Sequence, residues 1–87
     1  MHYRNQCIEL GLSFRVSKLL SSGTEYGLFY IPSGYQPYYQ IENMYVTMSN
    51  HQYFSIVIRE NNVISILPKT NIPANDILVI HEVWIQK

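Results

Sequence analysis

The sequence has little of what usually stabilises or marks a small functional domain. Cys7 is the only cysteine, so no disulfide can form within the chain. The three histidines, His2, His51 and His81, lie far apart, and none has an acidic or thiol neighbour at the spacing of a zinc site. We therefore expect no metal ion and no other cofactor.

Charge is scarce, and neither sign dominates. Six Lys and Arg balance six Asp and Glu, and the basic residues are spread singly along the chain. A basic stripe for phosphate binding is missing, which argues against nucleic acid as a partner. No apolar run approaches the roughly 20 residues of a membrane-spanning helix, and no apolar core of an export signal follows residues 1–5. We expect a product of the cytoplasm that does not insert into membranes.

Familiar catalytic patterns are missing too. The chain has no Gly-rich phosphate loop and no Ser/His/Asp arrangement, and its six acidic residues are scattered over different segments. Cys7 has no histidine placed to activate it as a nucleophile. We predict no catalytic residue and no enzymatic activity. A small hydrolase with two facing carboxylates stays as an alternative.

Strands are the elements that the sequence predicts, because no segment has sustained helical periodicity. Residues 6–16 alternate with period two, which is typical of a half-buried strand. Gly11 on its polar face indicates a bend or bulge. Residues 76–85 form a closing strand, in which His81 is expected to be a core or interface histidine.

The middle of the chain contains shorter β segments. Residues 26–31 are apolar on both sides, which indicates a strand buried on both faces, between sheets or against a partner subunit. Residues 38–48 are weakly β, and their core face is predicted to carry Met44, Val46 and Met48. Residues 53–59 place Phe54, Ile56 and Ile58 on one face.

Turn signals separate these segments. Asn61 and Asn62 lie between two β runs and predict a tight hairpin, because asparagine tolerates the left-handed region. In residues 30–37, two prolines flank Ser33 and Gly34, so we expect the strand to end near Ile31, turn, and leave as an irregular arm. The loop at 68–75 suits a crossover between sheets.

The predicted fold is all-β: one small antiparallel β-sandwich, jelly-roll-like, spanning residues 1–87. At this size a chain buries only about 60–65% of its unfolded surface, so a lone monomer is marginally stable. With no disulfide and no metal, oligomerisation is the expected source of further stability.

Tyrosine is the compositional outlier, with seven of its eight copies between Tyr26 and Tyr53. Aromatic rings with polar tips suit sugar stacking and protein interfaces. We predict a saccharide- or partner-binding surface made by Tyr38, Tyr39, Tyr45, Asn50, His51 and Tyr53. The alternative is that most of these tyrosines pack at sheet edges or between subunits.

Three segments form a recognisable pattern: residues 28–37 (Leu-Phe-Tyr-Ile-Pro-Ser-Gly-Tyr-Gln-Pro), the hairpin at 56–66 and the final strand at 77–86. Together they resemble the C-terminal β-rich domain of tail-tip, baseplate and tail-fibre proteins from phages of Gram-positive bacteria. The structural motif comprises Pro32, Gly34, Tyr35, Pro37, Asn61 and Asn62. Gln36 replaces the family's common arginine, which removes any salt bridge that the arginine would make. Asn62 replaces a common glycine and implies a slightly different turn.

The resemblance implies a structural virion component of the tail, baseplate or fibre, produced in the cytoplasm of the bacterial host. Such domains generally form homotrimers, and they attach other tail proteins or bind saccharides of the host cell surface. The motif carries no catalytic residue. A monomeric carbohydrate-binding module of non-phage origin is the alternative function.

Overall fold

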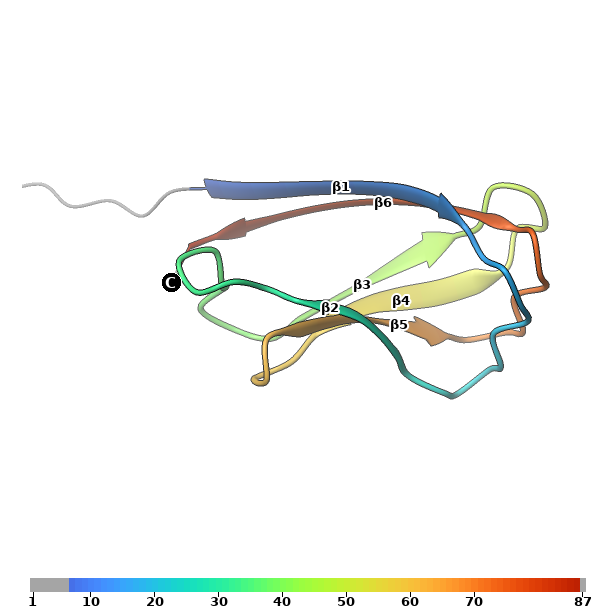
Figure 1. Cartoon of the computed structure of the whole chain (residues 1–87), viewed down its shortest axis with the longest axis horizontal. Coiled ribbons are helices and arrows are strands. Elements are labelled where there is room, and N and C mark those ends of the chain that lie inside the picture. The colour runs from blue at the N-terminus through green and yellow to red at the C-terminus, as the bar shows by residue number, and fades with distance from the viewer. Residues whose placement is uncertain (1–6, 87) are drawn as a thin grey trace, which may run out of the picture.

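The computed structural model describes residues 7–86, and all regular elements in this range are β-strands (Figure 1). No helix in this part of the chain is long and apolar enough to cross a membrane. The strands, in chain order, are β1 Cys7–Arg15, β2 Tyr26–Tyr30, β3 Ile41–Val46, β4 Tyr53–Ile58, β5 Val63–Pro68 and β6 Ile77–Ile85.

The strands form two layers. β1 and β6 make a two-stranded sheet, and the second sheet has the order β2-β5-β4-β3. Every pairing is antiparallel, and the smaller sheet lies over one face of the larger one (Figure 1). This arrangement confirms the predicted small antiparallel β-sandwich. The crossover expected at residues 68–75 connects β5 to β6, from one sheet to the other.

The first and last strands pair along their whole lengths. Their register runs without a shift from Cys7 opposite Ile85 to Arg15 opposite Ile77. Gly11 faces His81 inside this regular ladder, so the bend or bulge expected at Gly11 was wrong. The irregularity in the fold lies instead in β2, where the register shifts between Gly27 and Phe29.

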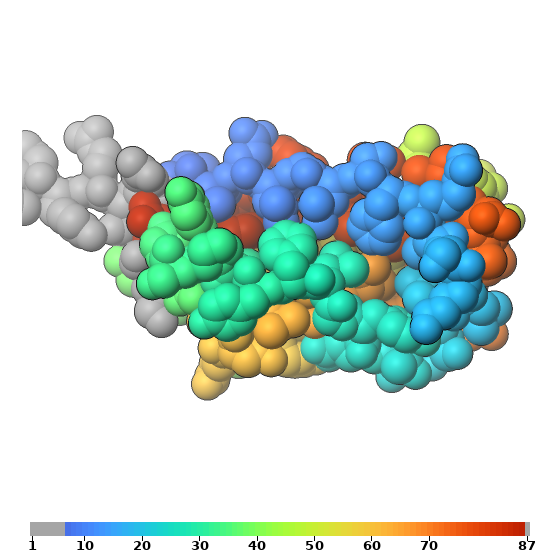
Figure 2. All heavy atoms as spheres, viewed as in Figure 1, coloured from blue at the N-terminus to red at the C-terminus, as the bar shows by residue number. Residues whose placement is uncertain are grey.

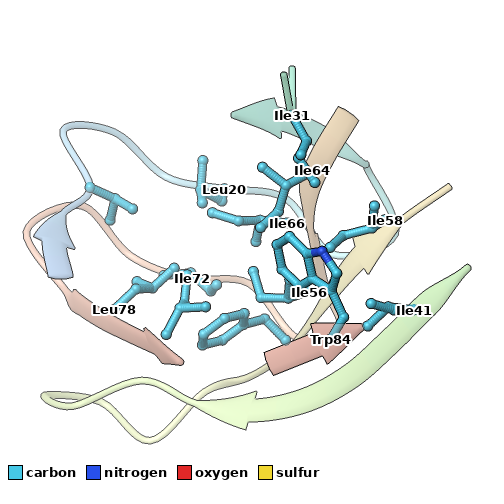
Figure 3. Close-up of a cluster of buried hydrophobic side chains, with 13 residues drawn as sticks. Leu20, Ile31, Ile41, Ile56, Ile58, Ile64, Ile66, Ile72, Leu78 and Trp84 are labelled. Atoms are coloured by element: carbon cyan, nitrogen blue, oxygen red, sulfur yellow. The ribbon is translucent and has the colours of Figure 1, made fainter. Parts of the chain in front are cut away.

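The core lies between the two layers (Figure 3). β4 and β5 occupy the middle of the larger sheet, and the side chains on both of their faces are largely buried. Each fully buried aliphatic side chain contributes about 1.5–3 kcal/mol. Trp84 extends from β6 into this cluster (Figure 3). The most completely buried apolar side chains are Phe54, Ile56, Ile58, Ile64, Ile66, Ile72, Leu78 and Ile80.

The prediction for the core face of β3 was wrong. Met44, Val46 and Met48 are exposed, Met44 to 62%. Ile41 and Tyr45 point inward instead, because the Tyr45 ring stacks on Phe54 with centroids 5.4 Å apart. An aromatic contact in the core therefore sets the inward face, although the methionines suggested the opposite phase.

The two predicted turns are confirmed. Asn62 has φ 61°, and its N–H donates to the Arg59 carbonyl at 2.9 Å, which closes the β4–β5 hairpin. Gly34 has φ 96°, a conformation that glycine adopts without strain, and the Tyr35 N–H donates to the Pro32 carbonyl at 3.1 Å.

β2 is less buried than the sequence indicated. It is an edge strand of the larger sheet, with Phe29 39% and Tyr30 60% exposed, so a single chain does not bury it on both faces. The other cover that was expected for it, a partner subunit, stays a prediction.

Candidate functional site

Two of the predicted binding residues, Tyr38 and Tyr39, line a pocket of about 240 Å³. They belong to the connection that enters β3, and the opposite wall comes from the β4–β5 hairpin. The two segments meet because Ile41, at the start of β3, pairs with Ile58, at the end of β4. The pocket is completed by Pro37, Gln40, Arg59, Glu60 and Asn62.

The charges in this pocket are largely balanced within the chain. Arg59 donates two hydrogen bonds to Glu25 Oε1, from Nη2 at 2.8 Å and from Nε at 3.1 Å. This hydrogen-bonded pairing lowers the pKa of Glu25 and raises the pKa of Arg59. Glu60 accepts a hydrogen bond from the Gln40 amide at 3.2 Å. The pocket therefore offers amide, carboxylate and guanidinium groups without a large excess of either charge.

A second pocket, of about 310 Å³, adjoins the first at Tyr39. Tyr39 and Gln40 line both pockets, and the second is completed by Ile41, Glu42, Asn43 and Val83. Tyr39 is 60% exposed, so its ring is accessible to a ligand that lies across the boundary between the two pockets. An exposed aromatic ring beside hydrogen-bonding groups is suited to a polar ligand with an apolar face, such as a sugar ring.

The other predicted binding residues lie elsewhere. Tyr45 faces the interior, and its hydroxyl donates to Glu82 Oε2 at 2.5 Å. Asn50 and His51 lie in the β3–β4 turn, and Tyr53 begins β4 beside that turn. This turn is separated from Tyr39 by the length of β3, about 20 Å at 3.4 Å per residue. The six residues therefore do not form one surface.

Asp76 holds the β3–β4 turn in place. Its Oδ1 accepts the N–H of Ser49 at 3.0 Å and the N–H of Ile77 at 2.8 Å. Burial alone would raise the pKa of this carboxyl, but hydrogen bonding by Thr47, Ser49, Asn50 and Ile77 outweighs burial and lowers it. The position of Asn50 and His51 thus depends on a buried carboxylate.

The predicted motif residues of the β2–β3 connection have a structural role. The Tyr35 carbonyl accepts the indole N–H of Trp84 at 2.6 Å, and the Gly34 carbonyl accepts the side-chain amide of Gln86. Pro37 forms an isolated antiparallel bridge with Gln86. These contacts fix the arm to the end of β6 and so place Tyr38 and Tyr39 beside the hairpin.

Sequence reasoning missed Gln40, Arg59 and Glu60 as pocket residues. The signal that could have found them is the predicted hairpin at Asn61 and Asn62. Residues that flank a hairpin lie beside the chain that enters the neighbouring strand, and here that chain carries Tyr38 and Tyr39.

His81 was expected to be a core or interface histidine. It is exposed and therefore not a core residue, whereas a position in an interface stays a prediction. Its Nε2 lies 2.6 Å from Glu9 Oε2 on the outer face of the β1–β6 sheet. Among residues 7–86, no three His, Cys, Asp or Glu side chains are grouped as metal ligands would be. Comparison with protein-family models finds no match, and neither does comparison with curated proteins or with solved structures.

Proposed function

We propose that this chain is a structural domain of a phage tail, baseplate or tail fibre. In this proposal it assembles with other copies of itself and with other tail proteins, and it attaches the virion to saccharides of the host cell surface. It acts by adhesion and assembly and not by catalysis. The trimer that the sequence resemblance implies belongs to the same proposal.

The observation that carries the proposal is the pocket at Tyr38 and Tyr39. Two tyrosines that are 54% and 60% exposed stand beside Gln40, Glu60 and Asn62, whose side chains can exchange hydrogen bonds with sugar hydroxyls. Because Glu25 already neutralises Arg59, the pocket suits a neutral saccharide better than an acidic one. Pro37 and Asn62, two of the motif residues on which the resemblance rests, line opposite walls of this pocket.

Binding to purified cell-wall polysaccharides of Gram-positive bacteria tests this site. Tyr39→Ala removes the ring shared by the two pockets and should abolish most of the binding. Tyr53→Ala is the matched control, since Tyr53 is 53% exposed but lies at the other end of β3. Loss of binding in the Tyr53 variant alone would move the site to the β3–β4 turn. If the unaltered chain binds no polysaccharide, the proposed role in attachment is wrong.

A monomeric carbohydrate-binding module is the second candidate, and one observation favours it. All residues that line the Tyr38–Tyr39 pocket belong to one chain, so the pocket needs no second copy. Light scattering over a dilution series separates the two functions. A monomer that still binds polysaccharide supports the module, whereas an oligomer stable to dilution supports the tail domain.

A further inference from the structure

The sandwich is open along one of its two long sides. A two-stranded sheet covers a four-stranded one, and strands within a sheet lie about 4.8 Å apart, so the smaller sheet is too narrow to cover the larger. β1 and β2 run along this side as edge strands of different sheets (Figure 1). The inward residues of β1 and the adjacent Leu28 of β2 are only partly buried.

The opposite side, between β3 and β6, is closed by polar contacts. The Met48 N–H donates to the Ile77 carbonyl at 2.9 Å, and the His81 N–H donates to the Tyr45 hydroxyl at 3.3 Å. The Asn43 amide donates to Glu82 at 2.7 Å. The outer edge of β6 therefore already has partners, and the uncovered width of the larger sheet lies beside β1.

An apolar groove follows the open side. Three adjoining hollows of about 270, 190 and 220 Å³ lie between β1 and β2 and share lining residues. Figure 2 shows the two strands along facing sides of this groove, with atoms of the C-terminal half visible between them. The apolar lining is made mainly by Ile8, Leu10, Leu12, Phe14, Leu28 and Phe29.

β1 also presents a row of backbone groups with no partner among residues 7–86. Backbone groups in an antiparallel ladder point alternately toward the paired strand and away from it. Val16 donates to Asp76 just beyond the ladder, whereas the His81 N–H, opposite Gly11, points away from β1 to the Tyr45 hydroxyl. The residues of β1 whose backbone N–H and C=O groups point away from β6 are therefore Cys7, Glu9, Gly11, Ser13 and Arg15.

Apart from two charged residues, Glu9 and Arg15, this edge has none of the features by which proteins usually block strand pairing. β1 is nine residues long and contains no proline, no lysine and no bulge. Such an edge is a ready template for another strand. A strand added there would also widen the smaller sheet and cover the apolar groove.

We propose that the occupant of this edge is β1 of a second copy of the chain, paired antiparallel about a two-fold axis at Gly11. The pairing would create a continuous sheet in the order β6-β1-β1-β6, with the Leu28 and Phe29 side chains of both copies brought toward one another beneath it. The inference rests on the self-assembly in the proposed function, but it takes a closed pair in place of the trimer. It closes after two copies, whereas the resemblance implies three.

The sequence of β1 is self-complementary in this register. Gly11 is the middle residue of the nine, so pairing about it uses the whole strand and keeps all apolar side chains on the groove side. Glu9 then faces Ser13 of the second copy, and Arg15 of that copy is its diagonal neighbour at about 7–8 Å, within reach of a long side chain. The two-fold axis therefore creates two such pairs of opposite charge, each between Glu9 of one copy and Arg15 of the other.

The mass in solution, measured by light scattering over a dilution series, tests the pairing. Gly11→Glu places two like charges opposite each other at the axis, and a side chain at Gly11 meets nothing within 4 Å in the single chain. Val79→Glu is the matched control, because Val79 is exposed on the same face of the sheet but lies on β6. We expect the unaltered protein and Val79→Glu to have twice the mass of one chain, and Gly11→Glu to have the mass of a single chain.

A charge exchange gives a second test. Glu9→Arg alone should weaken the pair, and combining it with Arg15→Glu should restore it. An unaltered protein with one or three chain masses would overturn the pairing, as would a Gly11→Glu variant that keeps two. Polysaccharide binding is measured separately on the same samples. If the paired protein binds no polysaccharide, the attachment role is wrong, whereas the pairing of the two β1 strands is unaffected.

Discussion

Tyr45 and Glu82 meet between the two sheets, with the phenol donating to the carboxylate at 2.5 Å. Glu82 is 1% exposed, and its other oxygen accepts the Asn43 amide at 2.7 Å. Burial, followed by the hydrogen bond to Glu82, raises the pKa of Tyr45 well above its usual value. A polar contact therefore joins β3 to β6 where an apolar contact would be the common solution.

Removal of the Tyr45 hydroxyl should cost stability out of proportion to one oxygen atom. Tyr45→Phe leaves one carboxylate oxygen of the buried Glu82 without a partner, at an expected cost of about 1–3 kcal/mol. Urea denaturation measures the difference. Tyr53→Phe removes an exposed hydroxyl and should change stability by less than about 0.5 kcal/mol. Equal effects of the two variants would contradict the structural role of the Tyr45–Glu82 contact.

The buried Asp76 should make stability depend on pH in the acid range. Its pKa in the folded state is below the ordinary value of 3.8, so its contribution is fully present above that value. The contribution is lost as the pH falls through 3.8 toward the folded-state pKa. Asp76→Asn should cost about 1–3 kcal/mol near neutral pH, and the gap should narrow in acid. A gap that is independent of pH would refute this assignment.

The two glycines at positions 34 and 11 should respond oppositely to alanine. Gly34 has φ 96°, so Gly34→Ala forces a side chain into the left-handed region and should destabilise the fold by about 1–2 kcal/mol. Gly11 lies in a regular strand with open space around it, and Gly11→Ala should be neutral or stabilising by up to about 1 kcal/mol. Thermal and urea denaturation of both variants compare them directly.

The inward face of β3 can be tested with one buried and one exposed side chain. Ile41→Ala should cost about 2–4 kcal/mol, because Ile41 belongs to the core. Met44→Ala should change the free energy of unfolding by less than about 0.5 kcal/mol. A larger loss of stability in Met44→Ala than in Ile41→Ala would show that the inward face of β3 is the one predicted from the sequence.

The fold class could be predicted from the sequence because its signals are local. Alternation in β1, the Asn-Asn hairpin and the glycine turn each depend on a few neighbouring residues, and all three are present. Which face of β3 points to the core could not be predicted, because Met44 and Tyr45 are both apolar enough to lie on either face. Only the stacking of Tyr45 on Phe54 and its bond to Glu82, 37 residues away, decide between them.

The candidate site was predictable only in part, for a similar reason. Tyr38 and Tyr39 were found by composition, whereas the hairpin residues opposite them are placed by the pairing of β3 with β4. Tyr38, Tyr39, Tyr45 and Tyr53 do not form the one surface that was predicted, because the length of β3 separates Tyr53 from the first two and Tyr45 faces the interior. Composition shows which side chains are available, and pairing decides which of them meet.

The pairing of β1 with β6 also constrains how the chain can fold. The two strands are the first and last of the fold, so their ladder joins residues far apart in sequence, which is typical of slow folding. During synthesis β1 has no sheet partner until residues 77–85 have left the ribosome, so the two-stranded layer that packs its apolar side against the core cannot form before then. Chaperone binding to Ile8, Leu10, Leu12 and Phe14 is expected in that interval, and completion of β6 would end it.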